Sequence, residues 1–385
     1  MRILVIADGV IPTGFSRVSH GIFDNFDSSE YEIHWFAINY NGSPHSSKHN
    51  LYPTAIFGSR EPYGFDRLGL FKDTKFDLIF ILNDVFIVNK YLEVIKNTFD
   101  KVPPVVVYTP VDSLNHSKSW YENFDVVKKL IAYNEYGKSI LEQHFPSRSI
   151  EVIPHGIDLS VFYKIDKPKE EIRKELLDRS DFINAPFIIF NGNRNQPRKQ
   201  IWRSLMAFSI FSKNKPDVRF YYHGGIIDAD INVIELAEWL GIQDKLILTN
   251  LKRGVQTVSN EYLNLIYNAT DVGVNSSIGE GWGLVNVEHA VTGAPQIIPA
   301  HSSFIELFSD CGFLIKPTDY HVNPNISTIG LTVSVENLAN AYEELYRNEN
   351  LRAELSKKSI EKFTHPKYDW VNISNRWKEL FKEVV

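Results

Sequence analysis

Short apolar runs alternate with longer amphipathic stretches along most of this 385-residue chain. The first run, RILVIA at Arg2–Ala7, is continuously apolar, as expected for a strand buried on both faces of a parallel sheet. Four similar runs follow, at Glu32–Ile38, Phe76–Leu82, Pro104–Thr109 and Lys129–Asn134. Helical patterns such as Asn89–Phe99 lie between some of them. Strands that alternate with helices predict parallel βαβ units and therefore an α/β fold.

The alternation stops near the middle of the chain and then begins again. Val152–Phe162 is rich in turn residues and Lys164–Asp181 is charged, so we expect a linker between two domains there. Strand-like runs return at Phe187–Gly192, Val218–Gly225, Lys245–Asn250 and Asp271–Ser277. A chain of this length also favours two domains of ordinary size. The sequence therefore predicts a second α/β domain and not a continuation of the first sheet.

The composition excludes several classes of protein. A formal net charge of −6 argues against a general nucleic-acid-binding protein, which would present a basic field. The single cysteine, Cys311, excludes an intrachain disulfide and a cysteine metal cluster. The apolar start of the chain is too short for a secretory signal, and no run approaches the ~20 apolar residues of a membrane-spanning helix. We therefore expect a cytoplasmic protein without a transmembrane segment.

One stretch, EGWGLVNVEH, carries two carboxylates around an apolar helical run. Gly281 and Gly283 permit a tight loop that brings the backbone close to a ligand. The helix that follows would begin near Gly283, where unpaired N–H groups and the helix dipole attract an anion. Glu280 precedes this anion site and Glu288 lies about 6 Å along the helix, so each acid could contact hydroxyl groups beside a phosphate. The alternative is a loop acid at Glu280 and a core ion-pair partner at Glu288.

A second stretch, FNGNRNQPRKQ at Phe190–Gln200, gathers cations after a predicted strand. Arg194, Arg198 and Lys199 stand at the opening of a helix. Ligands of open α/β sheets bind beyond the carboxyl ends of the strands. Three cations there could neutralise the charge that develops on a leaving diphosphate without a metal ion. The alternative is a solvated basic loop.

Two other positions are weaker candidates. Gly14 follows the first strand and would let a helix N-terminus approach a ligand, although the G-x-G-x-x-G fingerprint is absent. An ordinary strand–helix turn is the alternative there. Asp112 follows the strand at Pro104–Thr109, where a parallel sheet places its ligand. The chain has no HExxH motif, and we expect no metal site.

Together these stretches resemble the retaining glycosyltransferases of the GT-B architecture, family 4, the glycosyl transferases group 1. EGWGLVNVE is similar to the E-x7-E motif of that family, because seven residues separate Glu280 from Glu288. NGNRNQPRK resembles its phosphate-binding segment, VIPHGIDLSVF its interdomain stretch, and TGFSRVSHGIF its N-terminal glycine loop. The resemblance covers nearly the whole chain in order.

The resemblance implies two Rossmann-like domains that face each other across a cleft. Residues 1–155 would form the acceptor-side domain and residues 156–366 the nucleotide-sugar donor domain. A C-terminal helix at about 367–385 would cross back to the first domain and complete it.

The resemblance also implies roles for single residues. Glu280 would contact the donor sugar and Glu288 the ribose hydroxyls. Lys199 and an arginine would clamp the diphosphate, and Gly14 would approach it from the first domain. The sugar and the distal phosphate would be held by the backbone of Gly281, Trp282, Gly283, Leu284 and Val285.

Two positions depart from the family pattern. Alignment on PRK places Asn193 where the family has its arginine. We favour Arg194 for this role, as the nearest cation, with Arg198 as the alternative. Asp112 stands where many members have a histidine after the strand.

The implied activity is transfer of a hexosyl group, mannosyl or glucosyl, to a hydroxyl of a glycan, lipid or other acceptor, with retention and without a metal. The donor would be a nucleoside-diphosphate sugar, with GDP-mannose preferred and UDP-glucose next, and no other cofactor is expected. Base contacts would lie near Tyr221–Gly225 and Asn250–Gly254. We expect no nucleic-acid partner, while peripheral membrane contact and the oligomeric state stay open.

Two alternatives belong to other functional classes. An inverting GT-B transferase or a nucleotide-sugar epimerase would need a catalytic base in the first domain, for which Asp112, Asp84 and His20 are candidates. A non-enzymatic sugar-nucleotide-binding protein would keep the binding residues without the reaction.

Overall fold

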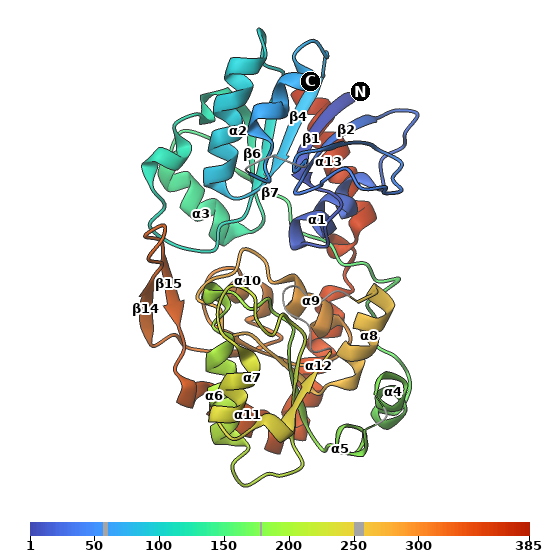
Figure 1. Ribbon diagram of the computed structural model, residues 1–385, viewed down its shortest axis with the longest axis vertical. Coiled ribbons are helices and arrows are strands. Elements are labelled where there is room, and N and C mark those ends of the chain that lie inside the picture. The colour runs from blue at the N-terminus through green and yellow to red at the C-terminus, as the bar shows by residue number, and fades with distance from the viewer. Residues whose placement is uncertain (57–60, 178, 250–257) are drawn as a thin grey trace. The chain divides into compact units, whose positions relative to one another are not determined.

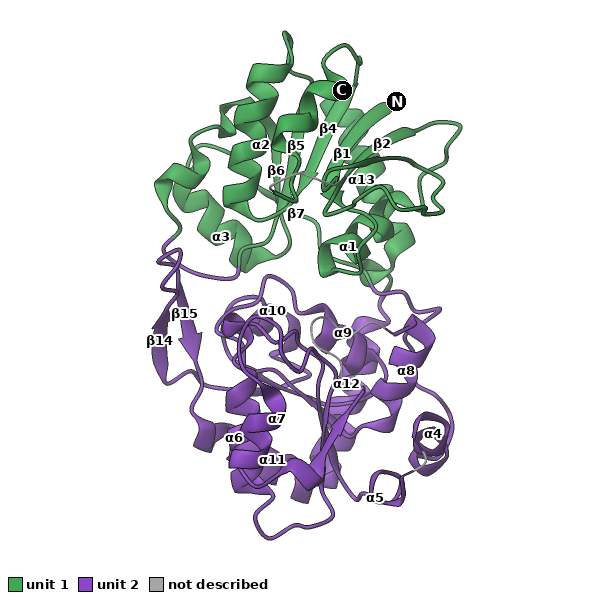
Figure 2. Ribbon diagram, in the orientation of Figure 1, with its two compact units in different colours: residues 1–111, 116–156, 366–385 green, residues 112–115, 157–365 purple. Residues whose placement is uncertain are grey.

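The computed structural model describes the chain except for residues 57–60, 178 and 250–257 (Figure 1). The chain forms two compact units (Figure 2). Unit 1 contains residues 1–111, 116–156 and 366–385, and unit 2 contains residues 112–115 and 157–365. The chain therefore leaves unit 1 for the four residues Asp112–Asn115, returns to it, and adds its last helix to it after completing unit 2.

Unit 1 is a parallel sheet of seven strands in the order β3-β2-β1-β4-β5-β6-β7. The strands are β1 (Arg2–Asp8), β2 (Glu32–Ile38), β3 (Asn50–Pro53), β4 (Leu78–Leu82), β5 (Val105–Thr109), β6 (Val127–Ala132) and β7 (Glu151–Val152). Its α-helices are α1 (Gly14–Phe23), α2 (Val85–Thr98), α3 (Glu135–His144) and α13 (Trp370–Val384). The strand order changes direction between β1 and β4, which is therefore the topological switch point of this sheet.

The apolar runs of the sequence are the buried strands of unit 1. Every residue of β4 and β5 is buried, as is all of β1 after Arg2, because these strands are covered on both faces. The final helix α13 packs into the same core: Trp377 meets Phe80 edge to face, with ring centroids 5.3 Å apart. A Cβ atom at Gly21 or Gly156 would lie 2.4–2.5 Å from the ring of Trp370, so both positions admit only glycine beside this helix.

Unit 2 is a parallel sheet of six strands in the order β10-β9-β8-β11-β12-β13. The strands are β8 (Ile188–Asn191), β9 (Arg219–Tyr222), β10 (Leu246–Leu248), β11 (Val272–Val274), β12 (Gln296–Pro299) and β13 (Phe313–Ile315). The helices are α4 (Lys169–Leu176), α5 (Ser180–Ile183), α6 (Ile201–Phe211), α7 (Val233–Trp239), α8 (Asn260–Ala269), α9 (Leu284–Val291), α10 (Ser303–Phe308), α11 (Val335–Arg347) and α12 (Glu349–Phe363). The switch point of this sheet lies between β8 and β11.

The core of unit 2 joins elements that are distant in the sequence. Residues of β8, α6 and β9 pack with the apolar face of α11, whose side chains Leu338, Tyr342 and Leu345 are completely buried. A separate two-stranded antiparallel hairpin, β14 (Asp319–Val322) and β15 (Ile329–Thr332), follows β13 and is not part of the six-stranded sheet. The second α/β domain predicted from the sequence is therefore present, with the hairpin as an addition.

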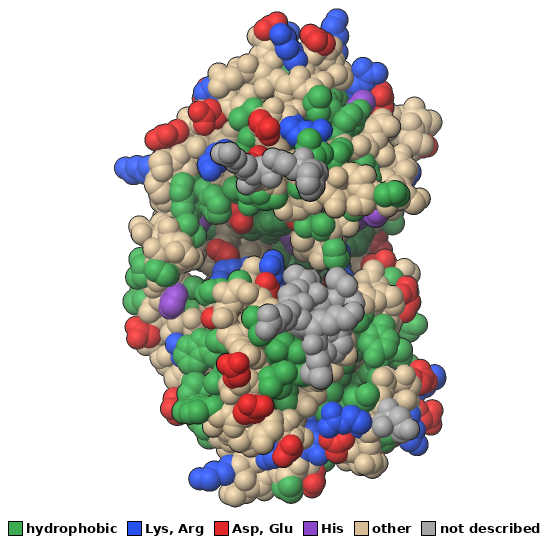
Figure 3. Space-filling model, viewed as in Figure 1, with side chains coloured by type: hydrophobic (Ala, Val, Ile, Leu, Met, Phe, Trp, Pro, Cys, Tyr) green, Lys and Arg blue, Asp and Glu red, His purple; other side chains and the backbone are tan. Residues whose placement is uncertain are grey.

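The surface agrees with the balanced charge of the sequence. On the face drawn in Figure 3, the basic and acidic side chains of the described residues are interspersed. Among the described residues, no helix is both long enough and apolar enough to cross a membrane.

Candidate functional site

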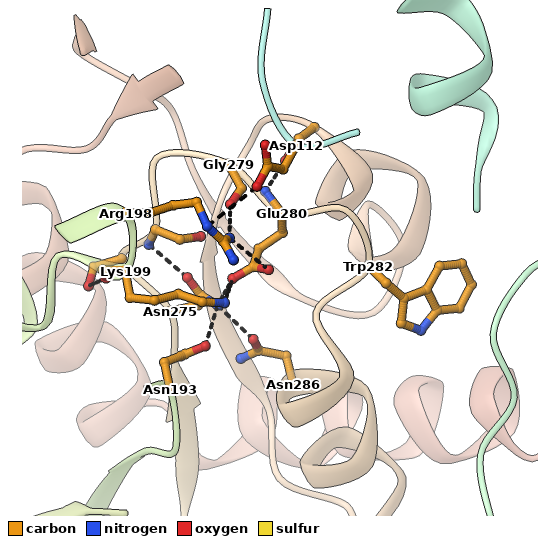
Figure 4. A network of polar contacts seen from close by, with 12 residues as sticks. Asp112, Asn193, Arg198, Lys199, Asn275, Gly279, Glu280, Trp282 and Asn286 are labelled. Atoms are coloured by element: carbon orange, nitrogen blue, oxygen red, sulfur yellow. Dashed lines mark hydrogen bonds and ion pairs between the residues drawn. The ribbon is translucent and has the colours of Figure 1, made fainter. Parts of the chain in front are cut away.

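The two predicted site stretches of unit 2 meet at the switch point of its sheet. The loop after β8 ends in a short 3-10 helix, Pro197–Lys199, and the loop after β11 leads to Glu280. Because β8 and β11 are adjacent parallel strands, both loops leave the same edge of the sheet. Their side chains form a polar cluster, drawn in Figure 4.

Two cations and one carboxylate form the centre of this cluster. The ammonium group of Lys199 pairs with the carboxylate of Glu280, and Nη1 of Arg198 lies 3.5 Å from Oε2 of the same carboxylate. Arg198 also donates a hydrogen bond of 2.9 Å from Nη1 to the carbonyl of Gly279. The side chains of Glu280 and Lys199 are 6% and 12% exposed, whereas that of Arg198 is 33% exposed. Arg198 is thus the member of the cluster that solvent reaches most easily.

The cations set the charge state of the cluster. Burial alone would raise the pKa of Glu280, but the charges of Lys199 and Arg198, together with hydrogen bonds, bring it down to about 2. Burial lowers the pKa of Lys199, and the charge of Glu280 opposes that effect. A carboxylate held this far below its ordinary pKa stays ionised at neutral pH and is a poor proton acceptor.

The buried amide of Asn275 contacts the Glu280 carboxylate and two further amides. Nδ2 of Asn275 lies 2.9 Å from Oδ1 of Asn286, 3.3 Å from Oε1 of Glu280 and 3.4 Å from Oδ1 of Asn193. Oδ1 of Asn275 accepts a 2.7 Å hydrogen bond from the backbone N–H of Ser277. The sequence reasoning missed Asn275 and Asn286 as site residues. The available signal was an asparagine directly after a strand at the same edge as the cations.

The start of helix α9 requires its glycine. Gly283 is the N-cap residue with φ +91°, and a Cβ there would lie 2.5 Å from the ring of Phe304. The predicted backbone ligands lie along this turn, from Gly281 through Trp282 to the first helical residues Leu284 and Val285. In Figure 4 the side chain of Trp282 points away from the Glu280 cluster.

The second glutamate of the motif lies elsewhere. Glu288 is buried within α9, and its carboxylate accepts a 3.1 Å hydrogen bond from the hydroxyl of Tyr267 on α8. The structure therefore places Glu288 against a tyrosine and Glu280 against two cations. The ribose contact assigned to Glu288 stays a prediction.

The structure brings Arg198, and not the preferred Arg194, to the Glu280 cluster, while the diphosphate contact of either arginine stays a prediction. Arg194 forms a two-point ion pair with Asp228, at 2.6 Å and 3.1 Å, and its side chain is half exposed. Arg198 instead lies beside Lys199 and Glu280. The 3-10 turn at Pro197–Lys199 and the left-handed conformation of Gln200, with φ 50°, bring Arg198 and Lys199 back toward the loop after β11.

The remaining predicted residues fall in different units. Asp112 belongs to unit 2, where its Oδ2 lies 3.4 Å from Nε of Arg198. Gly14 is the first residue of α1 in unit 1, and the alternative base candidates His20 and Asp84 also lie in unit 1. Of the expected base-contact segments, Tyr221–Gly225 covers the end of β9 and the three residues after it, while Asn250–Gly254 lies outside the described residues.

The model of the family described as glycosyl transferases group 1 matches residues 172–362, which include every cluster residue except Asp112. The chain belongs to the glycosyl transferases group 1 family. Enzymes of this family transfer a sugar from a nucleotide sugar, and this is the general function of the chain. No curated protein matches its sequence.

Solved structures show the fold of this group 1 glycosyltransferase. Sucrose-phosphate synthase from Thermosynechococcus elongatus is 16% identical with a TM-score of 0.78, over 100% of this chain and 98% of that one. Anabaena HepE in complex with UDP and glucose is 17% identical with a TM-score of 0.73, over 100% of both chains. A glycosyltransferase from Rickettsia africae is 14% identical with a TM-score of 0.70, over 100% and 98%. The predicted α/β fold class with two Rossmann-like GT-B domains is confirmed.

Proposed function

We propose that this glycosyltransferase moves a hexosyl group, mannosyl or glucosyl, from a nucleoside-diphosphate sugar to a hydroxyl acceptor, with retention and without a metal ion. The observation that carries the proposal is the buried Lys199–Glu280–Arg198 cluster at the switch point of unit 2. It lies where open α/β sheets bind their ligands and next to the start of a helix.

The two cations suit a diphosphate leaving group. As the bond to the sugar breaks, negative charge accumulates on the diphosphate, and Lys199 and Arg198 would neutralise it. Lys199 is mostly removed from water, so its charge acts through a low effective dielectric and is already fixed in place. A bound diphosphate would compete with Glu280 for Lys199 and free the carboxylate to accept a hydrogen bond from a sugar hydroxyl.

The charge state of Glu280 argues against Glu280 as the catalytic base. While it is paired with Lys199 and Arg198, its pKa is about 2, and it is too weak a base to take the proton of an acceptor hydroxyl at neutral pH. In our proposal the acceptor attacks from the face that the diphosphate leaves, and the departing phosphate oxygen takes the proton. Nuclear magnetic resonance of the anomeric proton in the product tests this directly. An inverted anomer would favour the inverting transferase, and an epimerised sugar nucleotide would favour the epimerase.

For the donor we propose a nucleoside-diphosphate hexose, with GDP-mannose and UDP-glucose as the two candidates to test first. The HepE structure holds UDP and glucose and supports including the second. A thermal-shift panel should show stabilisation by one nucleoside diphosphate, because saturating ligand at 100 Kd contributes about 2.7 kcal/mol. If the chain bound a nucleotide yet neither transferred nor hydrolysed any sugar, the non-enzymatic binding protein would be the better interpretation.

We also propose that Glu288 binds the ribose hydroxyls when the nucleotide enters. Its hydrogen bond from Tyr267 fixes the carboxylate on α9, about 6 Å along the helix axis from Leu284, the first residue of the helix. Glu288→Ala should weaken nucleotide binding more than it lowers the melting temperature. The opposite result would make Glu288 a structural partner of Tyr267 only.

A further inference from the structure

The β14–β15 hairpin attaches to a segment that comes from far earlier in the sequence. Leu114 and Ile329 exchange two backbone hydrogen bonds, of 2.8 and 2.9 Å. Nδ2 of Asn115 donates a further bond of 2.8 Å to the carbonyl of Ser327. Because of these contacts, the segment Asp112–Asn115 belongs to unit 2, although the residues before and after it belong to unit 1 (Figure 2).

The same hairpin strand also contacts the loop that carries Glu280. The backbone N–H of Leu331 donates a 2.9 Å hydrogen bond to the carbonyl of Ile278. Next to it, a Cβ atom at Gly330 would lie 2.5 Å from that carbonyl oxygen, so the strand can approach the loop only with glycine at this position. Strand β15 therefore touches the segment 112–115 and the site loop at once.

Asp112, the first residue of the segment 112–115, contacts the site directly. A Cβ atom at Gly279 would lie 1.8 Å from the carbonyl oxygen of Asp112, so the two backbones are in direct contact. The carboxylate of Asp112 lies 3.4 Å from Nε of Arg198, and Nη1 of the same guanidinium bonds to the Gly279 carbonyl (Figure 4). The backbone carbonyl of Arg198 in turn accepts a 2.9 Å hydrogen bond from the N–H of Ile278.

We propose that Asp112 is a positioning residue, which the β14–β15 hairpin holds in place so that Arg198 stays aimed at the donor diphosphate. Arginine has a long flexible side chain, and fixing it in advance removes the entropy loss that a bound anion would otherwise have to offset. Asp112 and the Gly279 carbonyl fix two edges of the guanidinium. This inference rests on the proposed function and adds a role for the hairpin, with Asp112 acting through Arg198 and not on the substrate.

A double-mutant cycle on the full-length chain tests the inference. The readout is the affinity for UDP and for GDP by calorimetry, with donor hydrolysis as a second measure. Asp112→Asn should weaken nucleotide binding roughly 5- to 10-fold, as expected for loss of one coupled charge pair. Arg198→Ala should weaken it at least as much, and the double variant should be no worse than Arg198→Ala alone. Asp112→Glu should restore part of the loss.

The other outcomes separate the alternatives. If the fold-loss in affinity of the double variant equals the product of the two single fold-losses, Asp112 acts independently of Arg198 and the inference is overturned. An unchanged affinity in Asp112→Asn also overturns it. If the wild-type chain binds neither nucleotide, the proposed function fails first and this inference fails with it.

The role of the hairpin can be tested with a glycine of β15 and a control glycine elsewhere in the chain. Gly330→Ala should weaken nucleotide binding in the wild-type background and have no further effect in Arg198→Ala. Gly69→Ala, in unit 1, makes the same change where no atom lies within 4 Å of the added Cβ, and it should leave binding unchanged. If Gly330→Ala does not fold, Asn115→Ala removes the link to Ser327 with a smaller disturbance. A lower melting temperature with unchanged affinity in either variant would reduce the hairpin to a structural addition.

Discussion

The two sheets place a buried carboxylate at the same topological position, and the two carboxylates behave in opposite ways. Asp8 ends β1 at the switch point of unit 1, and Glu280 follows β11 at the switch point of unit 2; each residue is 4% exposed. Burial raises the pKa of Asp8, whose hydrogen bonds come from Thr13 and Asn39. The pKa of Glu280 falls instead, because Lys199 and Arg198 outweigh burial.

The comparison shows that burial and fold alone do not make the site. At the unit 1 switch point, the hydrogen-bond partners of Asp8 are uncharged: Thr13, which also caps α1, and Asn39 both donate to its carboxylate. At the unit 2 switch point, the side chains reach across strands to one another. What differs is the pair of cations in the loop after β8, and this pair is the reason that our proposal places the diphosphate in unit 2.

The sharpest test removes the charge from each carboxylate without changing its shape. Glu280→Gln leaves two cations without their counter-charge, and breaking such a buried pair costs about 3–5 kcal/mol of the free energy of unfolding. Asp8→Asn relieves a buried charge but replaces one acceptor oxygen with an NH2 group that faces Thr13 or Asn39, so its loss should be clearly smaller than that of Glu280→Gln. Urea unfolding of both variants at pH 7 measures the difference. Equal losses in the two variants would contradict the assignment of the cations as the deciding factor.

The second test removes the buried cation. Lys199→Ala should lower turnover about 10²–10³-fold, equivalent to about 2.7–4 kcal/mol, because the diphosphate loses a fixed charge in a site removed from water. The measurement is the rate of transfer or of donor hydrolysis, with circular dichroism to show that the fold is intact. Arg194→Ala is the matched control, because its cation pairs with Asp228 outside the cluster and its loss should change the rate little. A near-native rate in Lys199→Ala would remove Lys199 from the proposed clamp.

Much of the fold could be predicted because strands and helices that are buried leave recognisable runs of apolar residues in the sequence. The continuously apolar strands β1, β4 and β5 are buried on both faces, and their runs were visible. The edge strands β3 and β7 were not predicted, since they are short and only partly buried. The hairpin was missed for a related reason: its strands have four residues each and β14 is largely exposed.

The two stretches that form the site could be predicted from the sequence, but the contacts between their side chains could not. Both Glu280 and Lys199 were named from the sequence, because charged residues in the loops after predicted strands are a local signal. The choice between Arg194 and Arg198 depends on the backbone turn at Gln200, which the order of residues does not reveal. Asn275 and Asn193 are 82 residues apart, and amides that meet across such a distance carry no periodic signal.

The third test concerns a property that the two units share. His155 in unit 1 and His289 in unit 2 are both buried, and burial lowers the pKa of each to about 3. Because the unfolded chain binds a proton near pH 6.5 and the folded chain does not, each histidine contributes stability that is fully present above pH 6.5. That contribution falls as the pH drops from 6.5 toward 3, by about 1.4 kcal/mol per pH unit and per histidine.

The measurement is the slope of the free energy of unfolding against pH between 6.5 and 4. His155→Gln and His289→Gln should each make this slope shallower, and the double variant should remove both contributions. The pKa of His20 is shifted in the opposite direction. Burial lowers it, but the hydrogen bond and the charge of Asp24 outweigh burial and raise it. An unchanged slope in His289→Gln would mean that this ring is protonated in the folded chain.

The smallest effect is expected from removing metal ions. If Lys199 and Arg198 supply the positive charge for the leaving diphosphate, a divalent cation at the unit 2 switch point is not needed. Dialysis against EDTA should therefore leave the transfer rate within experimental error of the untreated enzyme. The informative control is the Lys199→Ala variant assayed with added Mg²⁺, since a metal bound to the diphosphate could replace the missing ammonium charge. If EDTA lowers the transfer rate of the wild-type enzyme and Mg²⁺ restores that rate, the two cations are insufficient. The difference between the two switch points would then include a metal ion at unit 2.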